Sequence, residues 1–294
     1  MVDRSRIWIP AIAGLCGALV VALRRKGKTR APGHWPAILA HRGASARAPE
    51  NTLEAFRLAV EEGAGGLELD VHATRDGEIV VIHDATVNRT TDGSGAVAGM
   101  TLGELRRLDA GYRFSPDGGR TFPYRGRGVE IPTLAEVYEE FPDAHVNVAI
   151  KEARAGAQEA VMRVVRDAAA EARTLVASID HAVVRRFRRV SGGRIPTGAS
   201  RREIAAFYLL SRARLEALAR PAYDAFQVPV EHKGITLVTP RFLEAAHSRG
   251  ARVDVWTIND AAEMRRLWDL GVDGVMTDRP GVLASLLEER REGR

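Results

Sequence analysis

Short apolar runs alternate with amphipathic segments along most of the chain, and this alternation limits the folds that the chain can adopt. Eight runs have the length and composition of buried strands: 37–40, 66–71, 146–150, 174–178, 195–199, 224–228, 252–256 and 273–276. Amphipathic stretches typical of helices lie between them: 51–62, 156–172, 201–219, 240–249 and 260–270. This order predicts an α/β fold, a TIM-type (β/α)8 barrel. A doubly wound open sheet is the main rival, but eight repeats in about 250 residues suit the barrel better.

One stretch, 68–84 (ELDVHATRDGEIVVIHD), breaks this alternation. It holds two strand-like runs separated only by an Asp-Gly pair, which leaves no room for the crossover that a parallel connection needs. We therefore predict a hairpin arm with a tight Asp-Gly turn, paired so that Asp70 lies opposite His83. The Gly-rich segment 85–132 follows, and its one helical pattern is TLGELRRL. We expect this segment to be an insertion over the barrel mouth.

The N-terminus differs in composition from the rest of the chain. Residues 7–23 (IWIPAIAGLCGALVVAL) carry no charge; five basic residues follow them and two precede them. At about 17 residues, the run is just long enough to span a bilayer. It ends directly in arginines instead of a small-residue cleavage site, which favours one uncleaved transmembrane helix over a signal peptide. Because the more basic flank tends to stay in the cytoplasm, we predict a single-pass, membrane-anchored protein with its main domain on the cytoplasmic side.

These features divide the chain into four parts. We predict an anchor with a basic flank at 1–30, a linker at 31–36, the barrel domain at 37–288 and a charged tail at 289–294. The chain has 43 basic and 38 acidic residues, and the basic ones are scattered, which argues against nucleic acid as a partner. The single cysteine, Cys16, excludes an internal disulfide and a Cys-rich metal site.

Six polar side chains are expected to meet at the barrel mouth. Catalytic groups of such barrels lie at the C-terminal ends of the strands, where the loops to the next helices begin. Residues two apart on a strand share one face, so two carboxylates of the second strand point the same way. The set comprises His41 and Arg42 after the first strand, Glu68 and Asp70 on the second, His83 from the returning arm and Lys151 after the third.

This combination indicates metal-assisted phosphodiester chemistry. Two carboxylates in a barrel interior repel each other unless a cation neutralises them. For oxygen ligands, one hard divalent ion such as Mg²⁺ or Ca²⁺ fits best. Two histidines beside such an ion can act as general acid and general base, and Arg42 and Lys151 suit an anionic phosphate. Each residue alone fits an ordinary packing role as well, so the interpretation depends on the whole set.

Several segments resemble the signature of the glycerophosphodiester phosphodiesterase family. The likeness covers residues 37–288, and its motifs stand in the family's order. The matching segments are AHRGASARAPENTLEAF at 40–56, ELDVHATRDGEIVVIHD at 68–84, NRTTDGSGAV at 88–97, IPTLAEV at 131–137, VWTIND at 255–260 and GVDGVMTDRP at 271–280.

The resemblance implies a TIM-type barrel with an inserted segment, and hydrolysis of glycerophosphodiesters to an alcohol and glycerol 3-phosphate. In the family's usual mechanism the glycerol hydroxyl attacks phosphorus, and water then opens the resulting cyclic phosphate. The predicted anchor adds lysophospholipids, cleaved to lysophosphatidic acid, to the expected substrates. Carried over to this chain, the resemblance assigns acid–base catalysis to His41 and His83, metal binding to Glu68 and Asp70, phosphate binding to Arg42 and Lys151, and the lining of the glycerol pocket to Trp256.

One position departs from the family's pattern. The third strand of the family usually reads Asn-x-Glu-x-Lys, with the glutamate as a third carboxylate ligand. Here Asn147 and Lys151 match, but Ala149 stands between them, and Glu152 lies on the other face or in the loop. Such a site should bind an ion more weakly, with water or substrate oxygens completing its shell. The alternative is therefore a catalytically impaired or inactive binder of glycerophosphodiesters or lipid headgroups.

Other matched pieces have an architectural interpretation. Asn51 with Glu54 fits a helix start with a capping-box-like pair, although Glu50 could face the site. Thr277 and Asp278, after the last strand, fit either a loop cap or a support for the site. Phospholipase D-like cleavage of phosphatidyl lipids or sphingolipids on the same barrel would rest on fold analogy alone.

Overall fold

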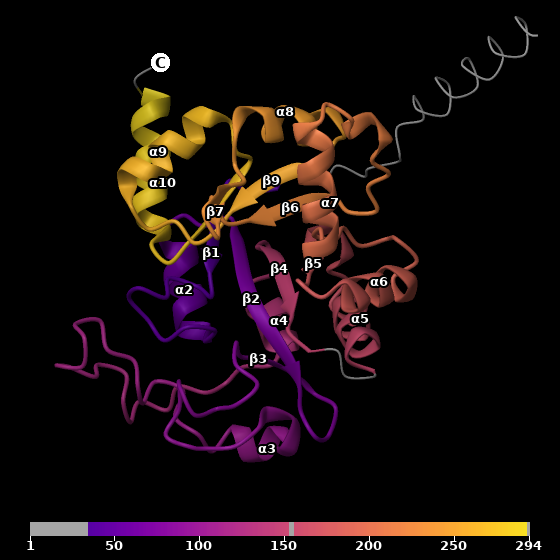
Figure 1. The fold of residues 1–294 in the computed structure, drawn as a ribbon. Helices are drawn as coiled ribbons and strands as arrows, with labels where there is room; N and C mark the ends of the chain where they lie inside the picture. Colours follow the sequence, from indigo (N-terminus) through magenta and orange to yellow (C-terminus); the bar gives the residue numbers. More distant parts are fainter. Residues whose placement is uncertain (1–34, 153–155, 293–294) are drawn as a thin grey trace, which may run out of the picture.

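A curled, mostly parallel sheet forms the centre of the computed structural model, which describes residues 35–152 and 156–292 (Figure 1). Its strands are β1 (Ile38–His41), β2 (Gly66–Ala73), β3 (Ile79–Val81), β4 (His145–Ile150), β5 (Thr174–Ala177), β6 (Ala225–Val228), β9 (Arg252–Val255) and β10 (Gly274–Thr277). They are ordered β5-β4-β2-β1-β10-β9-β6, and β3 pairs antiparallel with β2. A separate hairpin, β7 (Glu231–His232) with β8 (Ile235–Thr236), follows β6.

Helices surround this sheet, except for the short segments of the insertion, which lie below it (Figure 1). They are α2 (Leu53–Glu61), α3 (Leu102–Leu105), α4 (Leu134–Glu140), α5 (Ala157–Asp167), α6 (His181–Val190), α7 (Arg201–Arg212), α8 (Pro240–Ser248), α9 (Ala261–Leu270) and α10 (Pro280–Glu292), with short 3-10 turns η2 (Val97–Gly99), η3 (Glu171–Arg173) and η4 (Glu216–Leu218). Local sequence sets their ends: Thr133 and Glu136 form a capping box at the start of α4, and Gly271 ends α9 at a φ of 99°.

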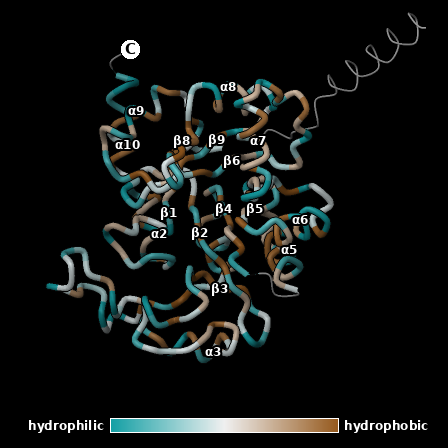
Figure 2. Tube along the Cα trace, viewed as in Figure 1, coloured by the Kyte–Doolittle hydropathy of each residue, from teal (hydrophilic) through white to brown (hydrophobic). Residues whose placement is uncertain are grey.

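The main core lies between the strands and these helices. All eight residues of β2 are buried, as expected for a strand covered on both faces. Outside β6, Phe207 of α7 and Phe242 of α8 pack against Phe226, with ring centroids 4.7 and 5.1 Å away. Hydrophobic positions gather around β3, β4 and α5, in the interior of the molecule (Figure 2).

The predicted barrel is confirmed as a TIM-barrel-like fold, with one correction. The segment predicted as the fifth strand, 195–199, is not a strand. It contributes single parallel bridges on either side, Val176 with Thr197 and Gly198 with Ala225, and so lies between β5 and β6. Pro196 has no N–H to donate to a ladder, which explains why pairing here does not extend.

The hairpin arm is present, but its register differs by one residue from our prediction. The paired residues are Val71 with Val81 and Ala73 with Ile79, so Asp70 lies opposite Ile82 and not His83. The turn explains the slip: Thr74 N–H donates to the carbonyl of Glu78, which makes a three-residue loop ending in Gly77 at a φ of 90°. A two-residue turn would place His83 opposite Asp70, whereas this loop is the common three-residue type with a left-handed glycine.

The insertion after β3 has a small core of its own. Val80 and Ile82 of the arm pack with apolar side chains of the predicted insertion, among them Val97, Leu105 and Val129. In Figure 1 this segment lies below the barrel and carries α3. The arm and the insertion therefore fold as one unit beside the mouth.

The predicted membrane localisation is wrong. Within residues 35–152 and 156–292, no helix is long and apolar enough to cross a membrane. The run at 7–23, from which we predicted an anchor on the cytoplasmic side, lies outside the described residues, as do linker residues 31–34. A span requires about 17 or more continuous apolar residues in a helix, and none of the described helices meets this requirement.

Candidate active site

The loop after β1 begins the candidate site. His41 ends the strand, and Arg42 and Gly43 follow in left-handed conformations, with φ of 57° and 87°. A Cβ on Gly43 would lie 2.6 Å from the backbone of Ala55, so only glycine allows α2 to pack this closely. The turn leaves His41 and Arg42 half-buried at the C-terminal ends of the strands.

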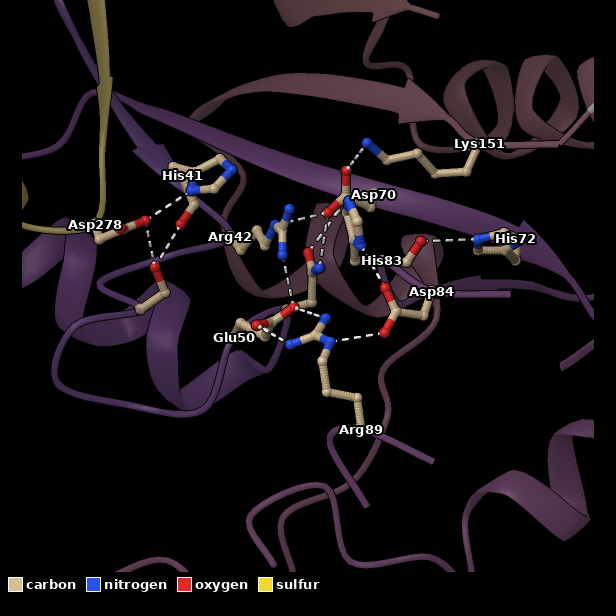
Figure 3. A network of polar contacts seen from close by, with 12 residues as sticks. His41, Arg42, Glu50, Asp70, His72, His83, Asp84, Arg89, Lys151 and Asp278 are labelled. Atoms are coloured by element: carbon tan, nitrogen blue, oxygen red, sulfur yellow. Dashed lines mark hydrogen bonds and ion pairs between the residues drawn. The ribbon is translucent and has the colours of Figure 1, made fainter. Parts of the chain in front are cut away.

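Asp70 of β2 is the centre of the site (Figure 3). Its side chain is 1% exposed, and Lys151 Nζ lies 2.7 Å from its Oδ1. Arg42 Nε and Asn51 Nδ2 each lie 3.1 Å from its Oδ2. Burial raises the pKa of Asp70, but the positive charges of Lys151 and Arg42 outweigh it and hold the pKa below its ordinary value. Asp70 is therefore a buried carboxylate that two cations keep ionised.

Glu68, two residues earlier on the same face, has no such partners. It is 6% exposed, and its Oε2 is buried without a hydrogen-bond partner among the described residues. Burial and the negative charge of Asp70 raise its pKa to about 7. A buried carboxylate oxygen without a donor is costly, and a cation beside it would relieve that cost. The unpartnered oxygen of Glu68, near Asp70, thus fits the binding of a cation.

No third carboxylate completes that pair. Ala149 lies beside Asp70 in the pairing of β2 with β4, and Asn147 lies beside Glu68. Asn147 accepts a hydrogen bond from Gln227, while Glu152 Oε1 accepts one from the backbone of Ala73 at 2.6 Å. Across residues 35–152 and 156–292, no group of three His, Cys, Asp or Glu side chains is arranged to hold a metal ion.

Both predicted catalytic histidines have an aspartate at Nδ1. His41 Nδ1 lies 2.6 Å from Asp278 Oδ1, and His83 Nδ1 lies 2.6 Å from Asp84 Oδ1. Asp278 also accepts hydrogen bonds from Ser45 and Asn259. Since an ionised carboxylate only accepts, each Nδ1 carries a proton, and Nε2 of each ring is left for chemistry.

The environment of His41 favours its protonated form. Burial lowers the pKa of His41, but the hydrogen bond to Asp278 and the negative charge of Glu68 outweigh it, so the pKa lies above its ordinary 6.5. The pKa of Asp278 is lowered: burial opposes this, and the hydrogen bonds from His41 and Asn259 overcome it. Both shifts favour an ion pair between His41 and Asp278.

Direct side-chain contacts join three of the seven predicted site residues. Arg42, Asp70 and Lys151 form one cluster, and the histidines stand with their aspartates (Figure 3). Trp256, directly after β9, is 38% exposed and belongs to the opposite part of the sheet.

Sequence reasoning missed or misassigned several supporting residues. Asn51 does not cap α2; Thr52 does, and Asn51 instead contacts Asp70 from a left-handed backbone with a φ of 59°. Asp84 and Arg89 were overlooked, although the His-Asp dipeptide at 83–84 already suggests a histidine with its own carboxylate. Glu50 contacts Arg42, as the alternative interpretation of that motif allowed.

The mouth of this TIM-barrel-like fold carries two imidazoles with free Nε2 atoms, two cations and a buried carboxylate pair. These groups define the class of the protein. It is a hydrolase of phosphoric diesters. The glycerophosphoryl diester phosphodiesterase family model matches residues 41–282. The chain belongs to this family, which confirms the resemblance found in the sequence.

Individual relatives agree with this assignment. A protein named glycerophosphodiester phosphodiesterase from Caldanaerobacter subterraneus is 34% identical over 259 residues, which cover 86% of this chain and 98% of that protein. A mouse lysophospholipase D is 28% identical over 85% of each chain. The solved structure of an Oleispira antarctica phosphodiesterase in complex with the product sn-glycerol-3-phosphate matches with a TM-score of 0.68 and 26% identity, over 86% of this chain and 97% of that one. These relatives favour an enzyme over the inactive binder.

Replacing Asp278 should change the titration of His41. In Asp278→Asn the acceptor charge is lost while burial remains, so the pKa of His41 should fall below its wild-type value. NMR titration of the ring Cε1–H resonance measures both midpoints. Ser45→Ala, which removes one donor to Asp278 but keeps the carboxylate, should shift the midpoint less. An unchanged His41 midpoint in Asp278→Asn would contradict the assigned ion pair.

The same pair makes stability depend on pH. The folded pKa of His41 is raised above 6.5, so the folded state binds this proton more tightly than the unfolded chain. The contribution is therefore complete below about pH 6.5 and is lost as the pH rises through the folded pKa. Urea denaturation across this range, with His41→Asn as the reference, measures the loss of unfolding free energy.

Proposed function

We propose that the protein hydrolyses glycerophosphodiesters to an alcohol and glycerol 3-phosphate, with His41 and His83 as the acid–base pair. The observation that carries the proposal is the matched support of the two rings, each bound at Nδ1 by an aspartate 2.6 Å away. Such pairs orient an imidazole and fix its tautomer. In Figure 3 the His41 ring lies to one side of the cluster around Asp70, and His83 lies next to Asp70.

Arg42 and Lys151 would bind the substrate phosphate. Arg42 forms an ion pair with Asp70 through Nε and donates one hydrogen bond, from Nη1 to Glu50, so further donors face an anion. Lys151 has one contact to Asp70 for its three N–H groups. Asp70 thus holds both cations in place while leaving them net charge for the phosphate. A planar guanidinium with free N–H groups is well suited to this ligand.

The reaction would proceed in two steps. A glycerol hydroxyl attacks phosphorus, His83 Nε2 takes the hydroxyl proton, and His41 Nε2 gives its proton to the departing alcohol oxygen. The raised pKa of His41 supports its role as the acid in this step. Water then opens the cyclic phosphate: His41 takes a proton from the water, and His83 returns its proton to the glycerol oxygen. The products are the free alcohol and glycerol 3-phosphate, and both histidines regain their starting state.

Glu68 and Asp70 would hold one divalent ion, Mg²⁺ or Ca²⁺, together with water or substrate oxygens. The unpartnered oxygen of Glu68 supports this assignment. When bound, such an ion neutralises negative charge that builds up on the phosphoryl oxygens. Since Ala149 supplies no ligand, the chain's own contribution is limited to these two carboxylates.

Lysophospholipids are a second substrate class that specific residues favour. Three exposed apolar side chains lie on loops at the C-terminal ends of strands: Ile179 after β5, Ile235 in the hairpin after β6 and Trp256 after β9, which are 67, 49 and 38% exposed. Around the curled sheet β5, the segment 195–199, β6 and β9 are neighbours, whereas the charged residues come from β1, β2, β3 and β4. An acyl chain on the glycerol could extend from Trp256 over this apolar side. The mouse lysophospholipase D is consistent with such a substrate.

Loss of either histidine should abolish most turnover. His41→Asn and His83→Asn each keep a polar side chain without a titratable nitrogen, and kcat on glycerophosphocholine should fall about 10²- to 10⁴-fold. Release of choline and of glycerol 3-phosphate, assayed with Mg²⁺ or Ca²⁺, gives the rates. His247→Asn alters a histidine paired with Asp273 away from the site and serves as the control. Wild-type activity that survives both substitutions would refute the acid–base assignment.

Restoring a carboxylate at position 149 should strengthen ion binding. Ala149→Glu adds a third oxygen ligand beside Asp70, and its affinity for Mg²⁺, Ca²⁺ or Mn²⁺ should exceed that of the wild type about tenfold or more. Calorimetric titration measures this independently of turnover. Ala149→Gln has a similar size without the charge and should stay near the wild type. Equal ion affinity in the two variants would show that the ion does not bind beside Asp70.

Replacing the exposed isoleucines at the mouth should lower activity on lysophospholipids more than activity on glycerophosphodiesters. In Ile179→Ser/Ile235→Ser, kcat/KM on lysophosphatidylcholine should fall about tenfold or more, since each buried aliphatic side chain contributes about 1.5–3 kcal/mol. The same ratio on glycerophosphocholine should change little. Leu209→Ser replaces an equally exposed residue of α7 and is the matched control. A parallel loss on both substrates would argue against an acyl subsite.

A further inference from the structure

Arg89 belongs to the insertion but makes its side-chain contacts outside it. Its Nη1 and Nη2 donate to the two oxygens of Glu50 at 2.7 and 2.8 Å, and its Nε donates to Asp84 Oδ2 at 2.7 Å. Glu50 lies in the loop between β1 and α2, and Asp84 follows β3. All three guanidinium nitrogens are thus engaged, in a bidentate pair and one further charge-assisted bond.

Each of these acids also contacts a residue of the proposed reaction. Glu50 Oε1 accepts from Arg42 Nη1 at 2.9 Å, and Asp84 Oδ1 lies 2.6 Å from His83 Nδ1. Figure 3 shows the resulting chain of contacts, Arg42–Glu50–Arg89–Asp84–His83. Arg89 therefore connects a group that would bind phosphate with a group that would move a proton.

The contacts with Arg89 fix the orientation of Asp84 and Glu50. Because Arg89 takes Oδ2 of Asp84, Oδ1 faces the histidine, and the carboxylate cannot rotate freely. Hydrogen bonding from Arg89 is the largest influence on the pKa of Asp84, which falls to about 2. The pKa of Glu50 is lowered too: burial opposes this, and Arg89 and Arg42 overcome it. Both acids stay ionised acceptors over the whole physiological range.

The insertion has other means of holding its own fold. Val87 and Val97 are buried in its apolar core. Val87 N–H and Thr91 N–H donate to the carbonyls of Gly95 and Val87, beside and around Arg89. Arg89 itself is 47% exposed at the mouth and contributes little to that core. Its three contacts thus orient residues of the site and contribute little to the fold of the insertion.

We propose that Arg89 is a positioning residue for the phosphodiesterase reaction, which sets the His83 imidazole relative to the Arg42 guanidinium. The proposal rests on the proposed function for its catalytic consequence. By this route the insertion contributes a part of the active site. Loss of Arg89 frees Asp84 and Glu50 to turn, and a misplacement of about 1 Å at the reacting groups costs about 10²-fold in rate.

Steady-state kinetics on glycerophosphocholine test the proposal. Arg89→Ala should lower kcat about 10- to 100-fold and change KM less than about threefold, because His83 acts in the chemical step and Arg42 remains. Added guanidinium should restore part of the rate to Arg89→Ala. Arg89→Lys keeps the charge but cannot span both acids, so its kcat should lie between those of Arg89→Ala and the wild type.

A matched control separates positioning from simple anchoring. Arg75, in the hairpin arm, also donates to the insertion, to Glu104 Oε2 and the Gly99 carbonyl at 3.0 Å, but it has no contact with the site residues. Arg75→Ala should keep the wild-type kcat, while its melting temperature reports the cost of losing an anchor. Equal kcat losses in Arg75→Ala and Arg89→Ala would overturn the proposal.

A double-mutant cycle tests whether Arg89 acts through His83. If it does, adding Arg89→Ala to His83→Asn should lower kcat by less than about threefold further. If the kcat losses of the two single variants multiply fully in the double variant, the proposal is overturned.

NMR of the histidine rings separates this inference from the proposed function. In the wild type, His83 should show a protected, hydrogen-bonded Nδ1 proton, which Arg89→Ala should broaden or expose to exchange and Arg75→Ala should not. If the wild type fails to hydrolyse glycerophosphocholine, the proposed function fails, while the ring signals still decide whether Arg89 positions His83. An unchanged His83 signal in Arg89→Ala would refute the positioning role.

Discussion

The candidate site depends on one buried carboxylate, Asp70, and on the two cations that hold it ionised. A carboxylate that is 1% exposed needs nearby positive charge, and Lys151 and Arg42 supply it from β4 and from the loop after β1. The same contacts fix the two cations at the mouth, where an anionic substrate would meet their remaining N–H groups. The two contacts thus stabilise the buried charge and also hold the cations where a phosphate would meet them.

Charge balance also bears on position 149, where Ala149 offers no carboxylate beside Asp70. With Ala149 in that place, the site holds two carboxylates: Asp70, paired with cations, and Glu68, whose pKa of about 7 lets it be neutral or charged near physiological pH. A third carboxylate would need further positive charge. Burial at Glu68 disfavours a negative charge that no nearby cation neutralises.

Much of the fold and site could be predicted from local patterns. Strand positions, the hairpin arm and the groups at the strand ends follow from hydrophobic periodicity and from the rule that parallel strands end at one edge. The register of the hairpin arm was harder to predict from the sequence. The loop at 75–77 closes through Thr74 and Glu78, and because it has one residue more than a two-residue turn, Asp70 lies opposite Ile82 instead of His83. The sequence predicted Asn51 as a helix cap. In the structure Thr52 caps the helix, and Asn51 contacts Asp70, which the sequence alone does not show.

The sequence by itself determined most of the strand positions, the family and the residue types at the mouth, because these depend on periodicity and on residue type. Tertiary structure alone decided which partners those groups have. His41 meets Asp278 across 237 positions of sequence, and Arg89 joins Glu50 to Asp84 from within the insertion. Such pairings depend on the curvature of the sheet and on the path of loops, which bring distant residues within about 3 Å for a charge-assisted hydrogen bond. No local pattern encodes that distance.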